Sequence, residues 1–481
     1  MIRCGNIATN SSRSITSGWQ RCVPQRYVIG LLCFMAMVMA YIHRFCLSLA
    51  ITVMAESKHH LLASSSQCGN RPAKLFSNST VTLLTQEKYE FDWDEKTQGV
   101  ILSAFFWGYV LSQIPGGVLA DRYGGKRTLG FGMGVSIFST LLTPFAARTG
   151  GHRGMIAIRF ILGLGQGPVY PSVNTLLAQW VPPTERGRMG AFVFAGAMIG
   201  NVVSMALSGV IIRYIQGGWA SLFLIYGGAG LVWLVLWYIF AYNDPMSNPY
   251  MSDKEREYLE KNTGGLQRNK DLPATPWKRI FSCGPVWGLI IAQIGHDWGL
   301  FTIITDLPKY MKSVLHFSIT ENGLLSALPY IVMWFAALVS GGIVDYLIRP
   351  NRLTATVVRK IFITIASAGP AIGILAASYS GCNKFLAMIS FTIGMGLMGA
   401  FVPSLKVNAL DLSPNYAGTL MAVVGGIGAM SGILTPTLVG ILTPDGTLEE
   451  WRTVFWLSSI VLVVTNLIYL ALGSAEIQPW N

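Results

Sequence analysis

The stretch "GGVLADRYGGKR", Gly116 to Arg127, places four charged residues and four glycines between two strongly apolar runs. A helix that crosses a bilayer has to leave the bilayer before its backbone can turn in a polar segment. Glycines permit a tight reversal and a close approach of backbones, and basic residues favour the cytoplasmic face. The stretch therefore predicts a cytoplasmic turn between two membrane-spanning helices.

The composition of the whole chain agrees with a membrane protein. Of its 481 residues, 52% are hydrophobic and 12% are charged, whereas soluble domains are about 25% charged. A helix needs about 20 apolar residues to cross a bilayer. Runs of that length lie near residues 27–55, 97–119, 128–147, 152–177, 189–212, 220–242, 285–308, 321–345, 357–379, 384–406, 417–441 and 452–473. We expect an all-α integral membrane protein with twelve transmembrane helices.

The basic residues set the orientation. They gather in the N-terminal tail and in the loops after the second, fourth and eighth runs, so the positive-inside rule places both termini in the cytoplasm. This bias accounts for the net charge of +12, and no basic run carries interleaved aromatics, so we expect no nucleic-acid partner. The first run is too long for a signal peptide and many further runs follow it, so we expect it to be retained.

A long polar segment at 243–284 divides the runs into six and six, and the two halves echo each other. "GGVLADRY" has a counterpart in "GGIVDYLIRPNR" (Gly341–Arg352), and "WVPPTERGRMGAFVFAGAMIG" (Trp180–Gly200) has one in "LDLSPNYAGTLMAVVGGIG" (Leu410–Gly428). Such duplication is typical of transporters with a substrate site between two bundles. The expected domains are a cytoplasmic tail at 1–26, a first six-helix bundle at 27–242 with a lumenal loop at 56–96, a solvated linker at 243–284, a second bundle at 285–473 and a cytoplasmic tail at 474–481.

The expected lumenal loops carry two further signals. Asn78-Ser79-Thr80 is an N-glycosylation triplet, and Cys68 and Cys382 are the two of the seven cysteines that fall in such loops. A disulfide between them stays open, since spacing alone does not support it. The sequence has neither an HExxH nor a GxSxG motif and no metal-like CxxC pair, so we expect no catalytic residue and no metal site.

Two arginines inside the runs are candidate substrate contacts. At 1.5 Å per residue, Arg44 lies about 26 Å from the inner end of its helix and Arg159 about 12 Å from the outer end of its own. Two cations at one depth in a wet cleft would attract an anion, and the planar guanidinium suits carboxylate or phosphate. Gln166 and Tyr170 lie near the helix face of Arg159, and Tyr109 could reach the cleft from the second run. The alternatives are snorkelling or pairing with an internal acid for the arginines, and packing alone for Gln166.

His296 and Asp297 lie in the middle of the seventh run and are candidate proton or sodium sites. Adjacent helical residues point about 100° apart, so the two cannot line one narrow site equally. Alternatively, Asp297 pairs with a basic residue across the bundle. We expect Lys406 to snorkel toward the inner face and Asp306 and Lys309 to be interface residues at the outer end of the seventh run.

The chain resembles a known family. Gly117-xxx-Asp121-Arg122-x-Gly124-Gly125-Lys126-Arg127 resembles the loop motif of the major facilitator superfamily, in which it is a conformational latch. The resemblance implies the major facilitator fold and a latch, which we expect to consist of Gly117, Asp121, Arg122, Gly124, Lys126, Arg127 and Asp345.

The flanking segments narrow the resemblance. "FFWGYVLSQIPGG" (Phe105–Gly117), "RFILGLGQGPVYPSVNTLLAQWVPPTERGR" (Arg159–Arg188) and "HFSITENGLLSALPYI" (His316–Ile331) resemble the anion–cation symporters of solute carrier family 17. The matching positions of Arg44 and Arg159 in that family are assigned to substrate binding or coupling. Many relatives carry a proton-coupling glutamate where Gln166 stands, and Leu102 stands where the vesicular glutamate branch uses a histidine.

Together these features predict a secondary active carrier of inorganic phosphate or small organic anions that works by alternating access as a functional monomer. No cofactor is expected beyond a co-transported sodium ion or proton, and no partner beyond the anionic solute and membrane lipid. The tail Met1–Arg26 lacks an acidic dileucine signal, so the plasma membrane is favoured. A sialin-like carrier of organic anions or acidic amino acids in a lysosomal or vesicular membrane, and a non-transporting receptor on a carrier scaffold, stay open.

Overall fold

The computed structural model describes residues 24–55, 89–262, 276–348, 353–381, 383–413 and 417–481. The regular elements of these residues are all helical. The first half holds α2 (Gln25–Met54), α3 (Glu95–Tyr123), α4 (Gly125–Gln166), α5 (Val169–Trp180), α6 (Pro183–Tyr214) and α7 (Trp219–Phe240). The linker holds the short η2 (Pro245–Ser247), α8 (Asp253–Asn262) and α9 (Trp277–Phe281). The second half holds α10 (Gly284–Ser313), α11 (Ile319–Ile348), α12 (Ala355–Tyr379), α13 (Lys384–Met398), η3 (Gly399–Phe401), η4 (Val402–Lys406), α14 (Val407–Leu412), α15 (Ala417–Gly428), α16 (Ser431–Leu442) and α17 (Leu448–Leu472).

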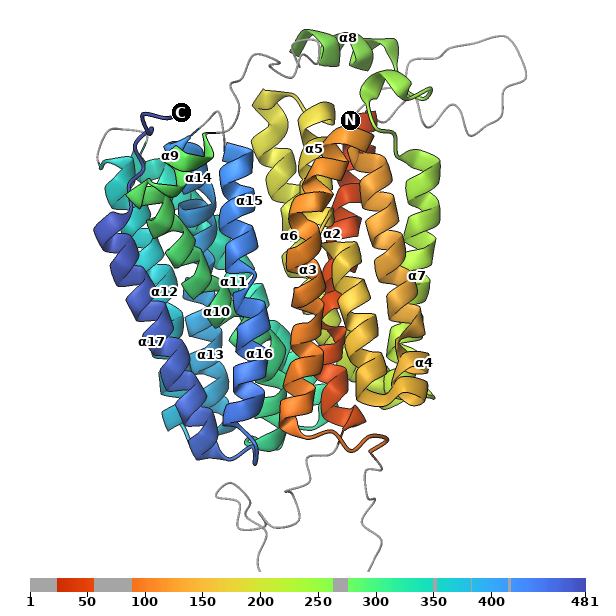
Figure 1. The fold of residues 1–481 in the computed structure, drawn as a ribbon, viewed down its shortest axis with the longest axis vertical. Coiled ribbons are helices and arrows are strands. Elements are labelled where there is room, and N and C mark those ends of the chain that lie inside the picture. The colour runs from red at the N-terminus through yellow and green to blue at the C-terminus, as the bar shows by residue number, and fades with distance from the viewer. Residues whose placement is uncertain (1–23, 56–88, 263–275, 349–352, 382, 414–416) are drawn as a thin grey trace, which may run out of the picture.

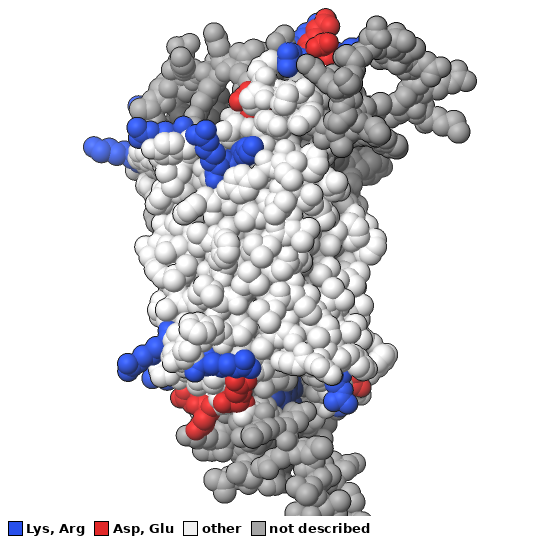
Figure 2. Space-filling model, turned by 90° about the vertical axis from the view of Figure 1, so that its right-hand side faces the viewer, with Lys and Arg blue, Asp and Glu red and all other residues white. Residues whose placement is uncertain are grey.

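The long helices form two groups that stand side by side, with α8 and α9 at the end where the chain termini lie (Figure 1). Figure 2 shows Lys, Arg, Asp and Glu at the two ends of the molecule and a band without them between. We call the end with the termini inner and the opposite end outer. A charge-free band between two charged ends is what a bilayer requires, because burying a charge in hydrocarbon is expensive.

Ten described segments are long and apolar enough to cross a membrane. One of them, Gly125–Leu177, is 53 residues long, and its backbone leaves helical geometry at Gly151, where φ is 54° and ψ is −140°. This segment therefore turns back and crosses twice. A further helix, α10, has 30 residues and is about 45 Å long at 1.5 Å per residue. The charged residues Asp297, Asp306, Lys309 and Lys312 interrupt its apolar sequence. These segments are consistent with the twelve expected crossings.

Glycines bring α3 into backbone contact with the second arm of α4. A Cβ at Gly163 would collide with the carbonyl oxygen of Phe105, and a Cβ at Gly108 would collide with that of Phe160. Without side chains at these positions the two backbones approach closely, as small residues allow in membranes. The contact holds Phe105 and Tyr109 at the level of Arg159.

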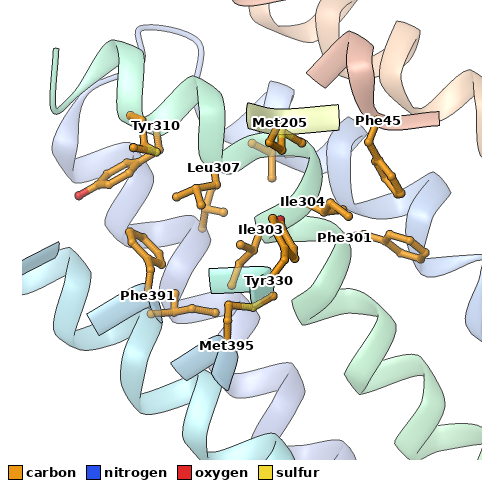
Figure 3. Close-up of a cluster of buried hydrophobic side chains, with 14 of the residues drawn as sticks. Phe45, Met205, Phe301, Ile303, Ile304, Leu307, Tyr310, Tyr330, Phe391 and Met395 are labelled. Atoms are coloured by element: carbon orange, nitrogen blue, oxygen red, sulfur yellow. The ribbon is translucent and has the colours of Figure 1, made fainter. Parts of the chain in front are cut away.

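The two bundles meet closely at the outer end. α3 packs against α16 and α6 against α11, and a Cβ at Gly323 would lie 2.7 Å from the carbonyl oxygen of Met205. Apolar side chains of both halves fill the space between, with Phe45 and Met205 in one cluster with Phe301 and Ile304 (Figure 3). The closest contacts between the bundles therefore close the outer side of the space between them.

An ion pair joins the bundles at this end. Lys309 Nζ of α10 lies 3.1 Å from Glu95 Oε2 of α3. The side chains of Lys309 and Asp306 are 5% and 0% exposed, so the expectation that they are interface residues is wrong. They are buried because they lie on the face of α10 that packs against other helices. The sequence does not identify which helices those are.

The turn predicted at Gly116–Arg127 is present, since α3 ends at Tyr123 and α4 begins at Gly125. Gly124 has φ of 92°, a conformation that favours glycine, and the backbone N–H of Lys126 donates to Asn243 Oδ1 at 2.9 Å. The described latch side chains Arg122 and Arg127 are exposed, and a Cβ at Gly117 would lie 3.6 Å from Pro171. The side chains of Asp121 and Asp345 lie outside the described residues, as do Cys68, Asn78 and Cys382.

The linker is not a wholly solvated connector, and that expectation is corrected. Glu255 of α8 is 6% exposed, and its carboxylate accepts from the backbone N–H groups of Gln25 at 2.8 Å and Arg26 at 3.1 Å. A carboxylate is stabilised at a helix N-terminus by the partial positive charge there. Arg26 also lies 3.1 Å from Glu185 of α6. Helix α8 is therefore docked on the inner ends of α2 and α6.

We predict that Gly163→Ala destabilises the protein, because the new methyl group collides with the α3 backbone. Such overpacking costs about 1–3 kcal/mol of the free energy of unfolding. Gly228→Ala in α7 is the matched control, since a Cβ there meets nothing within 4 Å and alanine favours a helix by about 1 kcal/mol. Thermal unfolding in detergent compares the two variants, and equal melting temperatures would contradict the packing described.

Candidate functional site

Arg44 of α2 is an enclosed charge that no described acid neutralises. Its side chain is 4% exposed, and it forms no ion pair within 4 Å among the described residues. The guanidinium carbon lies 4.7 Å from the ring centre of Tyr41, 4.8 Å from that of Phe105 and 4.6 Å from that of Tyr109. Such ring contacts stabilise a desolvated cation by about 2 kcal/mol. We call these three rings the aromatic cage.

Gln166 fixes one edge of this guanidinium. Arg44 Nε donates to Gln166 Oε1 at 3.1 Å. The Gln166 amide nitrogen donates to the carbonyl oxygen of Ala40 and to Ser136 Oγ, both at 2.9 Å. The fully buried amide thereby ties α2 to both arms of α4, and it acts on Arg44 through the Nε edge alone.

Arg159 lies at the depth of Arg44, as the sequence predicts, since its guanidinium carbon is 5.3 Å from the same Phe105 ring. We expected its terminal nitrogens to contact an anion, but in the structure they bind backbone oxygens. Nη1 donates to the carbonyl oxygen of His43 at 3.3 Å and Nη2 to that of Arg44 at 2.8 Å. In this structure Arg159 therefore holds the backbone of α2 at the point where Arg44 projects.

The two predicted tyrosines lie in the same neighbourhood. Tyr109 belongs to the aromatic cage, and the Tyr170 hydroxyl lies 2.8 Å from that of Tyr41. Sequence reasoning did not single out Tyr41 or Phe105. Tyr41 precedes Arg44 by three residues and so shares its helix face, which is a signal that could have identified it.

The second bundle carries another buried polar cluster, on α10 and η4. Asp297 is 8% exposed, and its Oδ1 accepts from Gln293 Nε2 at 2.7 Å. Lys406 Nζ donates to Gln293 Oε1 at 3.3 Å. Lys406 therefore points into the bundle rather than snorkelling, and that expectation is wrong. Lys406 ends a π-helical turn, and its acceptor Gln293 lies on another helix, α10, so the local sequence does not reveal it.

His296 does not share these partners. Its ring stacks on Phe401, and its Nδ1 is buried without a hydrogen-bond partner in the described part of the chain. The separation of the two side chains agrees with the 100° between neighbouring residues of a helix. Among the described residues no group of three His, Cys, Asp or Glu could hold a metal ion.

Tyr109 connects the two clusters. It contacts Arg44 and also interacts electrostatically with Asp297. Nearby, the rings of Phe106 and Phe301 pack edge to face with 4.6 Å between their centres, so α3 lies against α10. The caged arginine of one bundle and the carboxylate of the other therefore approach the interface from opposite sides.

The comparisons with known proteins agree with this arrangement. The family model "Major Facilitator Superfamily" matches residues 33–429. The chain is 38% identical to a putative inorganic phosphate cotransporter of Drosophila melanogaster, over 98% of this chain and 89% of that protein. It is 35% identical to human sialin, over 95% of this chain and 91% of that protein. It is also 35% identical to human vesicular glutamate transporter 2, over 84% of this chain and 70% of that protein.

Solved transporter structures share the fold. A bacterial homolog of the human lysosomal transporter Spinster, in an inward-facing and unoccupied conformation, superimposes with a TM-score of 0.69 at 15% identity, covering 95% of this chain and 99% of that one. The inward-open xylose transporter XylE of E. coli gives 0.69 at 13% identity, covering 93% and 96%. The expected fold class and family are thus confirmed. The chain belongs to the major facilitator superfamily and, within it, to solute carrier family 17.

Proposed function

We propose that the chain carries inorganic phosphate or a small organic anion across a membrane by alternating access, coupled to sodium ions or protons. As a member of this family the chain is a multi-pass membrane transporter and not an enzyme. The relatives named above are a phosphate cotransporter, a sialin and a glutamate transporter. Their names support a small anion as the solute.

The observation that carries the proposal is the caged guanidinium of Arg44. An arginine at the centre of a membrane helix costs about 3 kcal/mol on insertion scales, and a carboxylate partner would normally offset part of that cost. Arg44 has aromatic rings and an amide around it and no ion pair with a described acid. A transported anion supplies the missing charge, and the planar guanidinium can bind phosphate or carboxylate oxygens in pairs.

The other predicted residues support Arg44. Gln166 and Arg159 fix its helix and its orientation. The hydroxyl groups of Tyr109 and Tyr170 are hydrogen-bond donors near it, suited to anion oxygens. Arg159 uses two of its five N–H donors on α2 carbonyl oxygens. Its Nε has no hydrogen-bond partner among the described residues, so Arg159 keeps donors for an anion while it holds α2.

Coupling to a cation is assigned to Asp297, with His296 as a neighbouring proton acceptor. A carboxylate inside a membrane is a functional-site candidate by its cost alone. Helix α10, which carries Asp297, packs against α2 and α3 of the other bundle, so a cation at Asp297 and an anion at Arg44 attract each other. Attraction between two bound solutes is the physical basis of their transport together.

The proposal includes the plasma membrane as the location of the transporter and a monomer surrounded by lipid as its working form. Its sialin and glutamate-transporter relatives favour a lysosomal or vesicular home as the second candidate. Reconstituted liposomes test the proposal with phosphate, sialate and glutamate, each with and without sodium and with an imposed pH gradient. If the protein binds an anion but does not take it up, it is a receptor rather than a carrier.

We predict that Arg44→Lys raises the KM for the anion about tenfold and that Arg44→Ala abolishes uptake. A hydrogen bond between charged groups is worth about 1.5–3 kcal/mol, and lysine keeps the charge but loses the paired geometry. Arg148→Lys is the control, because Arg148 pairs with Glu90 at the outer surface. Unchanged uptake kinetics in Arg44→Ala would contradict the proposal that the anion binds Arg44.

We predict that Gln166→Glu makes uptake depend on pH. The ionised carboxylate would pair with Arg44 and repel the anion, and protonation would remove both effects. Uptake by the variant, divided by uptake by the wild type, should therefore rise as the pH falls from about 7.5 to about 4, where a glutamate becomes protonated. A ratio that stays constant or falls over this range would contradict the contact between Gln166 and Arg44.

A further inference from the structure

We propose that Lys406 is a tethered substitute for the transported cation. In the empty carrier its ammonium group neutralises Asp297 through the Gln293 amide, and it gives way when a sodium ion or a proton binds Asp297. The inference rests on the proposed cation-coupled function and adds to it a residue and an order of events.

The first step is the amide bridge itself. Gln293 Nε2 donates to Asp297 Oδ1 at 2.7 Å, and Gln293 Oε1 accepts from Lys406 Nζ at 3.3 Å. Asp297 forms no ion pair within 4 Å among the described residues, although Lys406 interacts with it electrostatically. A buried carboxylate requires a compensating charge. Lys406 supplies that charge from one residue away and leaves the carboxylate without a cation in direct contact.

The second step is the surroundings of the other carboxylate oxygen. A Cβ at Gly428 would lie 2.5 Å from Asp297 Oδ2, so the backbone of α15 covers this oxygen. The crossing segment Thr419–Leu442 is interrupted at the same place, since α15 ends at Gly428 and α16 begins at Ser431.

The end of α15 and the break in the crossing segment both suit a cation. The C-terminal end of a helix carries partial negative charge, and interrupted helices form ion sites in other transporters. The tight cover by Gly428 suits a small monovalent cation that has lost its water, or a proton. In the proposal, a cation that replaces the distant ammonium group binds at Oδ2, beside the C-terminal end of α15.

The third step concerns the backbone turn that carries Lys406. It ends the π-helical turn η4, directly after the three-residue turn η3. π-helical turns often occur at functional sites because their winding can change locally. Lys406 Nζ lies 5.6 Å from the Phe401 ring, which His296 covers by stacking. The charged or titratable groups near Asp297 are thus His296 beside it, Lys406 from η4 and Tyr109 from α3.

The fourth step is the charge balance. With Lys406 and ionised Asp297 the cluster has no net charge, and with a bound cation it has one positive charge. Helix α10, which carries Asp297, packs against α2 and, through the rings of Phe301 and Phe106, against α3. Cation binding therefore makes the interface more attractive to an anion. In the proposed order of events the cation binds first and the anion second.

Cation titrations of the purified full-length chain test the inference without requiring transport. Thermal unfolding in detergent is followed against sodium chloride, with choline chloride keeping the ionic strength constant, and against pH in sodium-free buffer. The two series distinguish sodium from a proton. The variants are Lys406→Gln, Asp297→Asn and, as a control, Lys384→Gln, whose ammonium group donates to the carbonyl oxygen of His316.

Lys406→Gln should bind the cation more tightly, because the competing charge is gone. A nearby opposite charge shifts a carboxylate by about 1–3 pH units, so we expect at least about a tenfold lower half-stabilising sodium concentration or an upward shift of about one pH unit. Asp297→Asn should lose the response, and Lys384→Gln should match the wild type. An unchanged or weaker response in Lys406→Gln, a full response in Asp297→Asn, or no response in the wild type would overturn the inference.

Phosphate uptake in liposomes provides the second measurement. Lys406→Gln should raise the KM for phosphate at saturating sodium or at low pH, since the loaded cluster no longer has a net positive charge. An unchanged KM would contradict the proposed order. If the wild type responds to the cation but carries no phosphate, the proposed substrate is wrong, and the cation titration alone decides the inference.

Discussion

The arrangement of this protein depends on one interaction, the enclosure of the Arg44 guanidinium by aromatic rings and an amide. A cation in the middle of a membrane protein requires either an acid or a compensating environment. Here Tyr41, Phe105 and Tyr109 supply the faces, and Gln166 accepts from one edge. Because none of these groups carries a negative charge at neutral pH, the positive charge stays available to a solute.

Contacts between the surrounding helices position the groups that enclose Arg44. The glycine contact between α3 and α4 sets the distance of Phe105 from Arg159. Arg159 then binds the α2 backbone where Arg44 projects. In a bilayer, backbone groups cannot rely on water, so close helix contacts and buried hydrogen bonds position the side chains. Arg159 therefore has a structural role in positioning α2 beside its candidate role in binding.

The second bundle solves a different electrostatic problem. Asp297 is buried and Lys406 is partly buried, and a direct contact would make a permanent pair that is hard to separate. The Gln293 amide keeps them apart while satisfying both. A carrier that alternates between states benefits from such a contact, because neither charge has to leave a strong ion pair during the cycle.

The sequence by itself determined the membrane class, the major facilitator fold, the turn around Gly124 and the candidate charges Arg44, Arg159 and Asp297 inside the helices. These features depend on local hydrophobicity, glycine and charge, which act within one or two helical turns. It did not determine that Arg159 donates to the α2 backbone, that Glu255 docks α8, that Lys309 pairs with Glu95, or that Lys406 turns inward to Gln293.

These four contacts join residues far apart along the chain. Tertiary structure alone decided them, because which helices lie side by side and which face each one presents follow from the packing of the two bundles as a whole.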